Sequence, residues 1–179
     1  MALDKKLIQT IKKFEAVSCI GPSSLRGQGG GVIGATRTYL EGIKLGRIPK
    51  GSQRSFSKWL DRHTEGILDS LPIPNRPWGA ARKALNLFLR SALYNHYLRK
   101  TYGIRAVERW LEVPVDSLIA DALKEQAPGR EKLRRWPGLK HLTPKEHAVY
   151  QQCAKDLARK KRLPATVFLD NYLWLENRG

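Results

Sequence analysis

The segment from Ala80 to Tyr102 constrains the fold most, because it is apolar on more than one side of a helix. One stripe at helical spacing consists of Leu85, Phe88, Leu89, Ala92 and Leu93, and a different side carries Leu87, Tyr94 and Tyr97. A helix that is apolar in several directions is usually buried along its length. We therefore expect one long helix, 80–102, through the middle of the domain.

The rest of the chain also has the spacing of helices, so we expect an all-α fold. Further helices are expected at 3–17, 32–43, 56–71, 106–111, from Asp116 onward, at 143–161 and at 165–175, although the last of these also suits a strand. Pro72, Pro74 and Pro77 force a non-helical segment between two of the helices. With 179 residues, no repeat and no linker of low complexity, the chain is expected to form a single domain, 1–179.

Two helix starts carry strong local signals. Asp116 precedes an apolar helical pattern and occupies the position of an N-cap. Thr143-Pro144-Lys145-Glu146 combines a threonine cap, a proline at the first helical position and a glutamate at the third. Both places are expected to begin a helix.

The formal net charge is +17, and the basic residues are spread along the chain. A field of that sign attracts polyanions, so nucleic acid is the first candidate partner and an anionic membrane surface the second. No apolar run approaches the roughly 18 residues of a membrane span, and no signal-peptide core follows the N-terminal charges. We expect a cytoplasmic protein without a membrane partner, with Cys19 and Cys153 reduced.

Metal and nucleotide sites have little support in the sequence. The four histidines are scattered and no Cys-x-x-Cys pair occurs, so we expect no metal site. The glycine run from Gly27 to Gly34 lacks the Gly-Lys-Ser/Thr of a phosphate-binding loop. It fits a tight backbone turn that lets another group approach closely. No cofactor is expected.

A lysine and an aspartate mark candidate chemistry. Lys83 follows the turn Pro77-Trp78-Gly79 near the start of a helix, and Asp116 caps another helix some thirty residues later. The positive end of a helix favours the neutral amine that a nucleophilic lysine needs. Asp116 is suited to stabilising a developing cation or to positioning that amine. By themselves, the two residues fit a surface lysine and an ordinary helix cap better than a catalytic pair.

Taken together, these segments resemble the helix-hairpin-helix DNA glycosylases, most closely the archaeal 8-oxoguanine DNA glycosylases and their bacterial OGG-like relatives. In that superfamily a hairpin leads into a helix with the catalytic lysine, and an aspartate follows at the next helix start. Lys83 and Asp116 match these positions, and Gln28, Asp170 and Trp174 match positions that contact the flipped base. The matched positions run from 28 to 174, which is most of the chain.

The resemblance implies a DNA glycosylase, with or without AP lyase activity, that acts as a monomer on duplex DNA containing a modified base. The first candidate base is 8-oxoguanine. Lys83 would attack the sugar C1′ and form a Schiff base, with Asp116 assisting. Trp174 would stack on the flipped base, and Gln28 and Asp170 would read its polar edge.

The hairpin in this resemblance implies a DNA contact through Trp78, Gly79 and Arg82. The chain departs from the family here, because it has Gly79 alone in place of a Gly-x-Gly pair. It also has Ser117-Leu118 in place of Thr-His after the aspartate. The first departure puts the backbone grip on DNA phosphates in doubt.

Three other functions stay open. The same fold could excise a hypermodified base from phage DNA as antiviral defence. Arg90 and His96 satisfy the loose Arg-x(4–6)-His pattern of HEPN-like ribonucleases, which are also helical. A non-catalytic nucleic-acid-binding protein would also carry this charge. Borohydride trapping separates the glycosylases from the other two, because only an amine nucleophile leaves a reducible imine.

Overall fold

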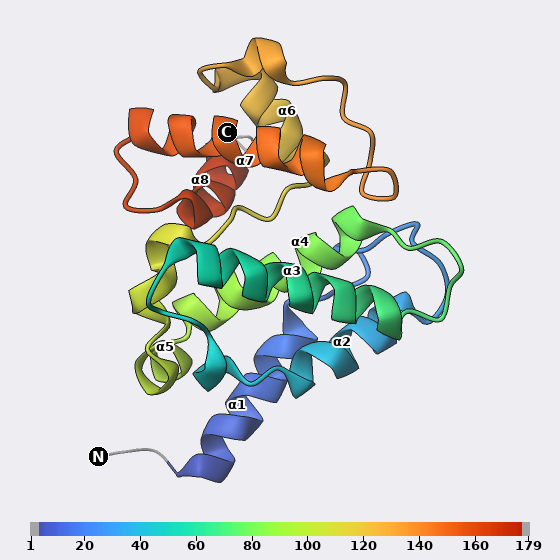
Figure 1. Cartoon of the computed structure of the whole chain (residues 1–179), viewed down its shortest axis with the longest axis vertical. Helices are drawn as coiled ribbons and strands as arrows, with labels where there is room; N and C mark the ends of the chain where they lie inside the picture. Colours follow the sequence, from blue (N-terminus) through green and yellow to red (C-terminus); the bar gives the residue numbers. More distant parts are fainter. Residues whose placement is uncertain (1–3, 177–179) are drawn as a thin grey trace.

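The computed structural model describes residues 4–176 as helices joined by loops, with no strand in that range, so the all-α prediction is confirmed (Figure 1). The α-helices are α1 (Lys5–Ser18), α2 (Val32–Gly42), α3 (Gln53–Ser70), α4 (Trp78–Tyr94), α5 (His96–Tyr102), α6 (Ser117–Gln126), α7 (Pro144–Lys160) and α8 (Leu169–Glu176). The 3-10 helices are η1 (Leu45–Arg47), η2 (Ile104–Trp110), η3 (Arg130–Lys132) and η4 (Thr166–Phe168). Leu3, where the first predicted helix begins, lies outside the described residues.

The single long helix predicted over 80–102 is wrong, because the structure divides it at Asn95 into α4 and α5. The Asn95 side chain accepts hydrogen bonds from the backbone amides of Tyr97 and Leu98, both at 3.1 Å. Its amide nitrogen donates to Glu15 on α1 at 2.8 Å. An asparagine that bonds nearby backbone amides competes with helix continuation, so Asn95 ends α4 and caps α5.

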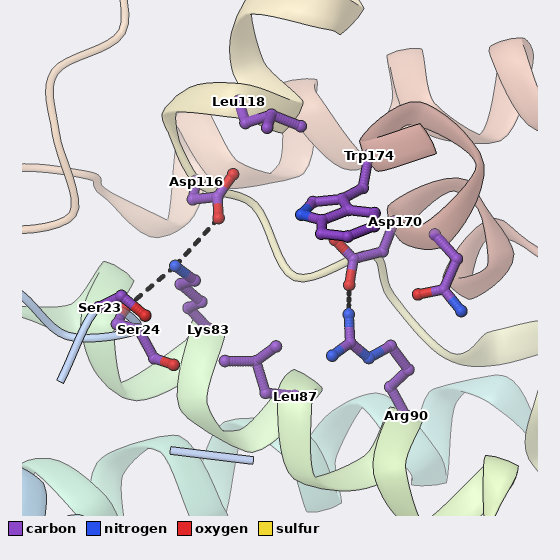
Figure 2. A pocket seen from close by; sticks show the side chains of 10 residues that line it. Ser23, Ser24, Lys83, Leu87, Arg90, Asp116, Leu118, Asp170 and Trp174 are labelled. Atoms are coloured by element: carbon purple, nitrogen blue, oxygen red, sulfur yellow. Dashed lines mark hydrogen bonds and ion pairs between the residues drawn. The ribbon is translucent and has the colours of Figure 1, made fainter. Parts of the chain in front are cut away.

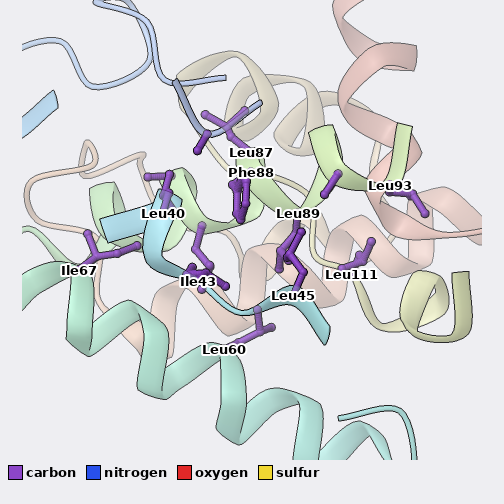
Figure 3. Close-up of a cluster of buried hydrophobic side chains, with 14 of the residues drawn as sticks. Leu40, Ile43, Leu45, Leu60, Ile67, Leu87, Phe88, Leu89, Leu93 and Leu111 are labelled. Carbon is purple, nitrogen blue, oxygen red and sulfur yellow. The ribbon is translucent and has the colours of Figure 1, made fainter. Parts of the chain in front are cut away.

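The central position predicted for this segment holds for α4. Helices α1, α2, α3, α5 and α7 all contact α4. Figure 3 shows Phe88 and Leu89 of α4 among apolar side chains from α2 and α3, such as Leu40 and Leu60. Phe88 is fully buried, and the buried stretch of α4 begins at Gly79. Helix α4 is therefore held in place from several sides, and the side chains that it carries have fixed positions.

A second apolar cluster joins α6, α7 and α8, which lie together in the upper part of Figure 1. Its fully buried members include Leu123, Leu169 and Leu173. The chain passes from the first cluster to the second through residues 111–116, which run beside the start of α4. This segment ends at Asp116, whose side chain accepts a hydrogen bond from the amide of Ile119 at 3.1 Å.

The remaining local predictions concern caps and the glycine run, and the structure confirms them. Thr143 and Glu146 form a reciprocal capping box at the start of α7. Gly31 has a φ of 76°, and a Cβ there would lie 2.9 Å from Cγ of Pro72. The turn thus lets segment 71–77 pack closely against the loop before α2. Within residues 4–176, no helix has both the length and the apolar character needed to cross a membrane.

Candidate active site

A cavity of about 520 Å³ opens where the loop before α2, the helix α4, the start of α6 and the helix α8 meet (Figure 2). Its walls are formed by Ser23, Ser24, Lys83, Leu87, Arg90, Asp116, Leu118, Asp170, Asn171 and Trp174. Four of the five residues predicted for catalysis and base recognition, Lys83, Asp116, Asp170 and Trp174, therefore line one cavity. Long-range packing brings them together from two helices, α4 and α8, and the cap of α6.

Lys83 and Asp116 form an ion pair in this cavity, with Nζ 3.0 Å from Oδ2. Lys83 Nζ also donates to the backbone oxygen of Ser24 at 3.1 Å. The other carboxylate oxygen of Asp116 accepts the hydrogen bond that caps α6. The Asp116 side chain thus both caps α6 and holds the amine of Lys83 in place. The Lys83 side chain is only 7% exposed, whereas that of Asp116 is 32% exposed.

The far side of the cavity is formed by α8 and by Arg90 of α4. Arg90 Nη1 and Asp170 Oδ2 form an ion pair, and both side chains are largely buried. Figure 2 shows this pair at one side of the cavity and the Lys83–Asp116 pair at the other, with Leu87 and Trp174 between them. Trp174 is 42% exposed, so part of its indole remains accessible. The cavity thus combines an amine, two carboxylates, a guanidinium and an aromatic face.

Gln28 is the predicted recognition residue that the structure does not bring to this cavity. It lines a separate cavity of about 240 Å³ beside residues 73–77 and Lys140. Its Nε2 donates to the backbone oxygen of Arg26 at 3.2 Å, and its buried Oε1 has no hydrogen-bond partner among residues 4–176. Its role in reading a base therefore has no support from this geometry.

The residues predicted to bind DNA through the hairpin lie in the first turns of α4, where two of them are buried. Arg82 is buried, and each of its guanidinium nitrogens already has a partner among Asp61, Thr64 and Glu112. The predicted DNA contact of Arg82 is corrected accordingly, because the side chain is only 5% exposed and four of its five N–H groups are bonded inside the protein. At Gly79 a Cβ would lie 2.6 Å from the backbone oxygen of Leu139. The lack of a side chain at this position therefore lets segment 139–142 pack against the start of α4.

Trp78 is half-buried at the same junction. Its ring meets the ring of His147 edge to face, with centroids 5.2 Å apart, and Arg82 lies over it at 5.5 Å. The three hairpin residues thus join the two apolar clusters. A DNA contact by Trp78 stays a prediction.

A network of buried polar side chains lies behind the site at this junction. Glu112 accepts two hydrogen bonds from Arg82, at 2.8 and 2.9 Å, and one from Asn86 at 2.9 Å. Burial raises the pKa of Glu112, but the charges of His147 and Arg82 and these hydrogen bonds outweigh it, and the pKa falls to about 2. Burial lowers the pKa of His147 to about 4 against the attraction of Glu112. At neutral pH the network holds an ionised glutamate and a neutral histidine.

Sequence reasoning placed Arg90 in a ribonuclease motif and missed its position in this cavity. Lys83, Leu87 and Arg90 follow the spacing i, i+4, i+7, which puts them on one face of α4. That spacing is the signal that could have joined Arg90 to Lys83. His96 lies beyond the break at Asn95, is exposed and lines neither this cavity nor the adjoining one. The Arg90–His96 motif therefore does not form one site.

A second cavity, of about 490 Å³, shares Arg90 and Asn171 with the first. Its other lining residues are Glu15, Ser18, Cys19, Ser91, Tyr94 and Asn95. Burial raises the pKa of the Cys19 thiol to about 12, so it stays a neutral thiol. Apart from Glu15 and Arg90, the lining is therefore neutral and mostly polar, and it includes the ring of Tyr94.

The chemistry available in the first cavity is that of an amine beside a carboxylate. No group of three or more His, Cys, Asp or Glu side chains within residues 4–176 is arranged to hold a metal ion. Lys83 is the candidate nucleophile of this cavity, since its Nζ lies 3.0 Å from a potential proton acceptor, the carboxylate of Asp116. Comparisons with protein-family models, curated proteins and solved structures found no match to this chain.

Proposed function

We propose that this protein is a DNA glycosylase that excises a modified base from duplex DNA, with Lys83 as the attacking amine. The observation that carries the proposal is the Lys83–Asp116 ion pair at 3.0 Å in a cavity that also holds Trp174 and Asp170. These residues come from three separate segments of the chain, and together they suit one reaction. The proposal places the protein in the cytoplasm, as a monomer that needs no cofactor.

Binding to DNA follows from the net charge of +17. Basic side chains neutralise phosphates and release counterions, largely without regard to sequence. The target base then has to leave the helical stack, because the reacting sugar carbon is otherwise out of reach. A cavity of about 520 Å³ lies within the size range of small-molecule sites and accepts one flipped base. Trp174 offers an aromatic face for stacking.

The reaction begins when Nζ of Lys83 loses a proton to Asp116 and attacks C1′ of the deoxyribose. The new bond joins Nζ to C1′, and the bond from C1′ to the base breaks, with its electron pair leaving on the base, which takes up the proton held by Asp116. Asp116, 3.0 Å from Nζ, is thereby a carboxylate again and stabilises the positive charge now on Nζ. It then relays a second proton from Nζ to O4′ as the sugar ring opens to a Schiff base, and it accepts the C2′ proton whose loss expels the 3′ phosphate.

The test is borohydride trapping on duplexes with 8-oxoguanine or with guanine at the same position. Borohydride reduces the imine to a stable amine, so the protein stays attached to the damaged strand. The variant Lys83→Gln should form no adduct. Lys12→Gln is the matched control, because Lys12 is also 7% exposed but bonds the backbone oxygen of Ile43 far from the cavity. Equal trapping by Lys83→Gln and wild type would refute the proposal.

The second cavity favours another candidate substrate for the same reaction, a base enlarged by a neutral polar group. The two cavities meet at Arg90 and Asn171, so a substituent could extend from the first into the second. Ser18 contributes a hydroxyl group there, beside Ser91 and Asn95, which both donate to Glu15. Excision of such a hypermodified base would fit defence against phage DNA.

Two duplexes separate these substrates: one with 8-oxoguanine and one with hydroxymethylcytosine that carries a sugar. Ser18→Leu narrows the second cavity at an exposed position. If the enlarged base is the substrate, this variant should lose activity on it at least tenfold. Unchanged activity on the enlarged base in Ser18→Leu would exclude the second cavity as its binding place.

A further inference from the structure

The position of Asp116 relative to Lys83 depends on the segment that precedes α6. Lys83 is carried by α4 in the first apolar cluster, whereas Asp116 caps a helix of the second. The two side chains meet at 3.0 Å, so a small shift of segment 111–116 would separate them. What fixes this segment against α4 therefore decides the geometry of the pair.

Glu112 ties the segment to the turn of α4 that carries Lys83. Its carboxylate receives Nε and Nη2 of Arg82 at 2.8 and 2.9 Å, and Arg82 is the residue next to Lys83. Asn86, one turn further along, donates to the same carboxylate at 2.9 Å. A planar guanidinium that meets both oxygens of a carboxylate fixes direction as well as distance. Glu112 is thus held at a defined place on α4.

The next residue is fixed to α7 by its backbone. The amide of Val113 donates to Oε1 of Gln151 at 3.2 Å, and Nε2 of Gln151 donates to the backbone oxygen of Val113 at 2.7 Å. Pro114 then follows with its restricted φ, and both Pro114 and Val115 are buried. Between these anchors and Asp116 the backbone has little freedom.

We infer that Glu112 is a positioning residue, which sets Asp116 against Lys83 by clamping segment 111–116 to α4. The consequence for catalysis rests on the proposed glycosylase function, whereas the geometry of the pair does not. Glu112 does not line the cavity, so it acts through Asp116. Because the pKa of Glu112 is about 2, the clamp stays charged throughout the neutral range.

The variant Glu112→Asp tests this inference, since it keeps the charge but shortens the side chain by one carbon. Asp cannot hold Arg82 and Asn86 without drawing the segment toward α4, which moves Asp116. A misplacement of about 1 Å can cost on the order of 100-fold in rate. We expect single-turnover adduct formation to slow at least tenfold, with duplex binding unchanged. Glu65→Asp, a surface change on α3, is the control.

A second measurement does not depend on catalysis. Acetic anhydride labels accessible lysines, and mass spectrometry gives the labelling rate of each one. In the wild type Lys83 and Lys12 are both 7% exposed, so both should label slowly. In Glu112→Asp the labelling of Lys83 should rise at least tenfold, because its carboxylate partner has moved, while that of Lys12 stays the same.

The outcomes separate the inference from the proposed function. Faster labelling of Lys83 alone supports the positioning role, even if the wild type forms no adduct and the glycosylase proposal falls. The positioning role is overturned if the labelling of Lys83 stays unchanged. It is also overturned if the labelling of Lys12 rises equally, because that result reports a general loosening of the structure. If Glu112→Asp does not fold, Asn86→Leu removes one hydrogen bond to Glu112 without a change of charge and should raise Lys83 labelling selectively by a smaller factor.

Discussion

The buried histidine at the junction of the two apolar clusters predicts how the stability of the protein depends on pH. His147 is 4% exposed, packs against Trp78 and has its Nε2 3.1 Å from Nε2 of Gln151. Its pKa falls from 6.5 to about 4 on folding, mainly because burial disfavours the charged ring. The unfolded chain therefore binds a proton more readily than the folded chain does.

The direction and size of the effect follow from this difference. The contribution of His147 to stability is complete above pH 6.5, falls as the pH drops toward 4, and changes little below that. At about 1.4 kcal/mol per pH unit, the loss is about 3 kcal/mol. Removing the titrating ring in His147→Gln should abolish this part of the pH dependence, whatever the variant does to stability at pH 7.

Urea denaturation at intervals between pH 4 and pH 8 measures the effect. The free energy of unfolding of the wild type minus that of His147→Gln should be constant from pH 7 to pH 8 and fall by about 3 kcal/mol between pH 6.5 and pH 4. Groups whose titration does not depend on His147 cancel in this difference, and Glu112, the group it does affect, titrates below most of this pH range. A flat difference across the whole range would show that His147 is not held neutral in the folded protein, and the reasoning about the junction would fail.

Other predictions concern packing, DNA binding and base recognition. Gly79→Ala should lower stability by about 1–3 kcal/mol in thermal melts, because a Cβ there would lie 2.6 Å from a backbone oxygen. The control Gly51→Ala, which has open space around its Cβ, should leave stability unchanged. Binding to undamaged duplex should weaken linearly with the logarithm of salt concentration in titrations, given the charge of +17; salt-independent binding would contradict the electrostatic account. Trp174→Ala should weaken binding to a duplex with a flipped modified base by about 1–3 kcal/mol but leave binding to an abasic duplex unchanged, and an equal loss on both would refute its stacking role.

The parts of the fold that local chemistry determines could be predicted from the sequence. Caps such as Asp116 and Thr143 act on amides within three residues, so their effect is visible in a short stretch of sequence. The break at Asn95 was missed because the strong apolar pattern of the segment runs past it. The Asn95 side chain is also held by Glu15, which lies 80 residues away in the chain.

The candidate site was also predictable in part, and the parts that were missed depend on contacts between residues far apart in the sequence. The resemblance to a known family, together with spacing, pointed to Lys83, Asp116, Asp170 and Trp174, which the structure brings to one cavity. The predicted role of Arg82 was wrong because its partner Glu112 lies 30 residues away in the sequence and meets it in the interior, where Arg82 is 5% and Glu112 is 18% exposed. Nothing in the sequence around Arg82 distinguishes a buried arginine from one that faces a phosphate.

The central claim is that Lys83 is the amine that attacks the sugar, and mapping the reduced adduct tests it most directly. The wild-type protein is trapped with borohydride on a modified duplex, digested, and searched by mass spectrometry for the lysine that carries the sugar fragment. The account predicts a single modified lysine, Lys83, and no adduct on a matched unmodified duplex. An adduct on any other lysine, or the absence of an adduct on 8-oxoguanine, enlarged-base and abasic duplexes alike, would contradict it.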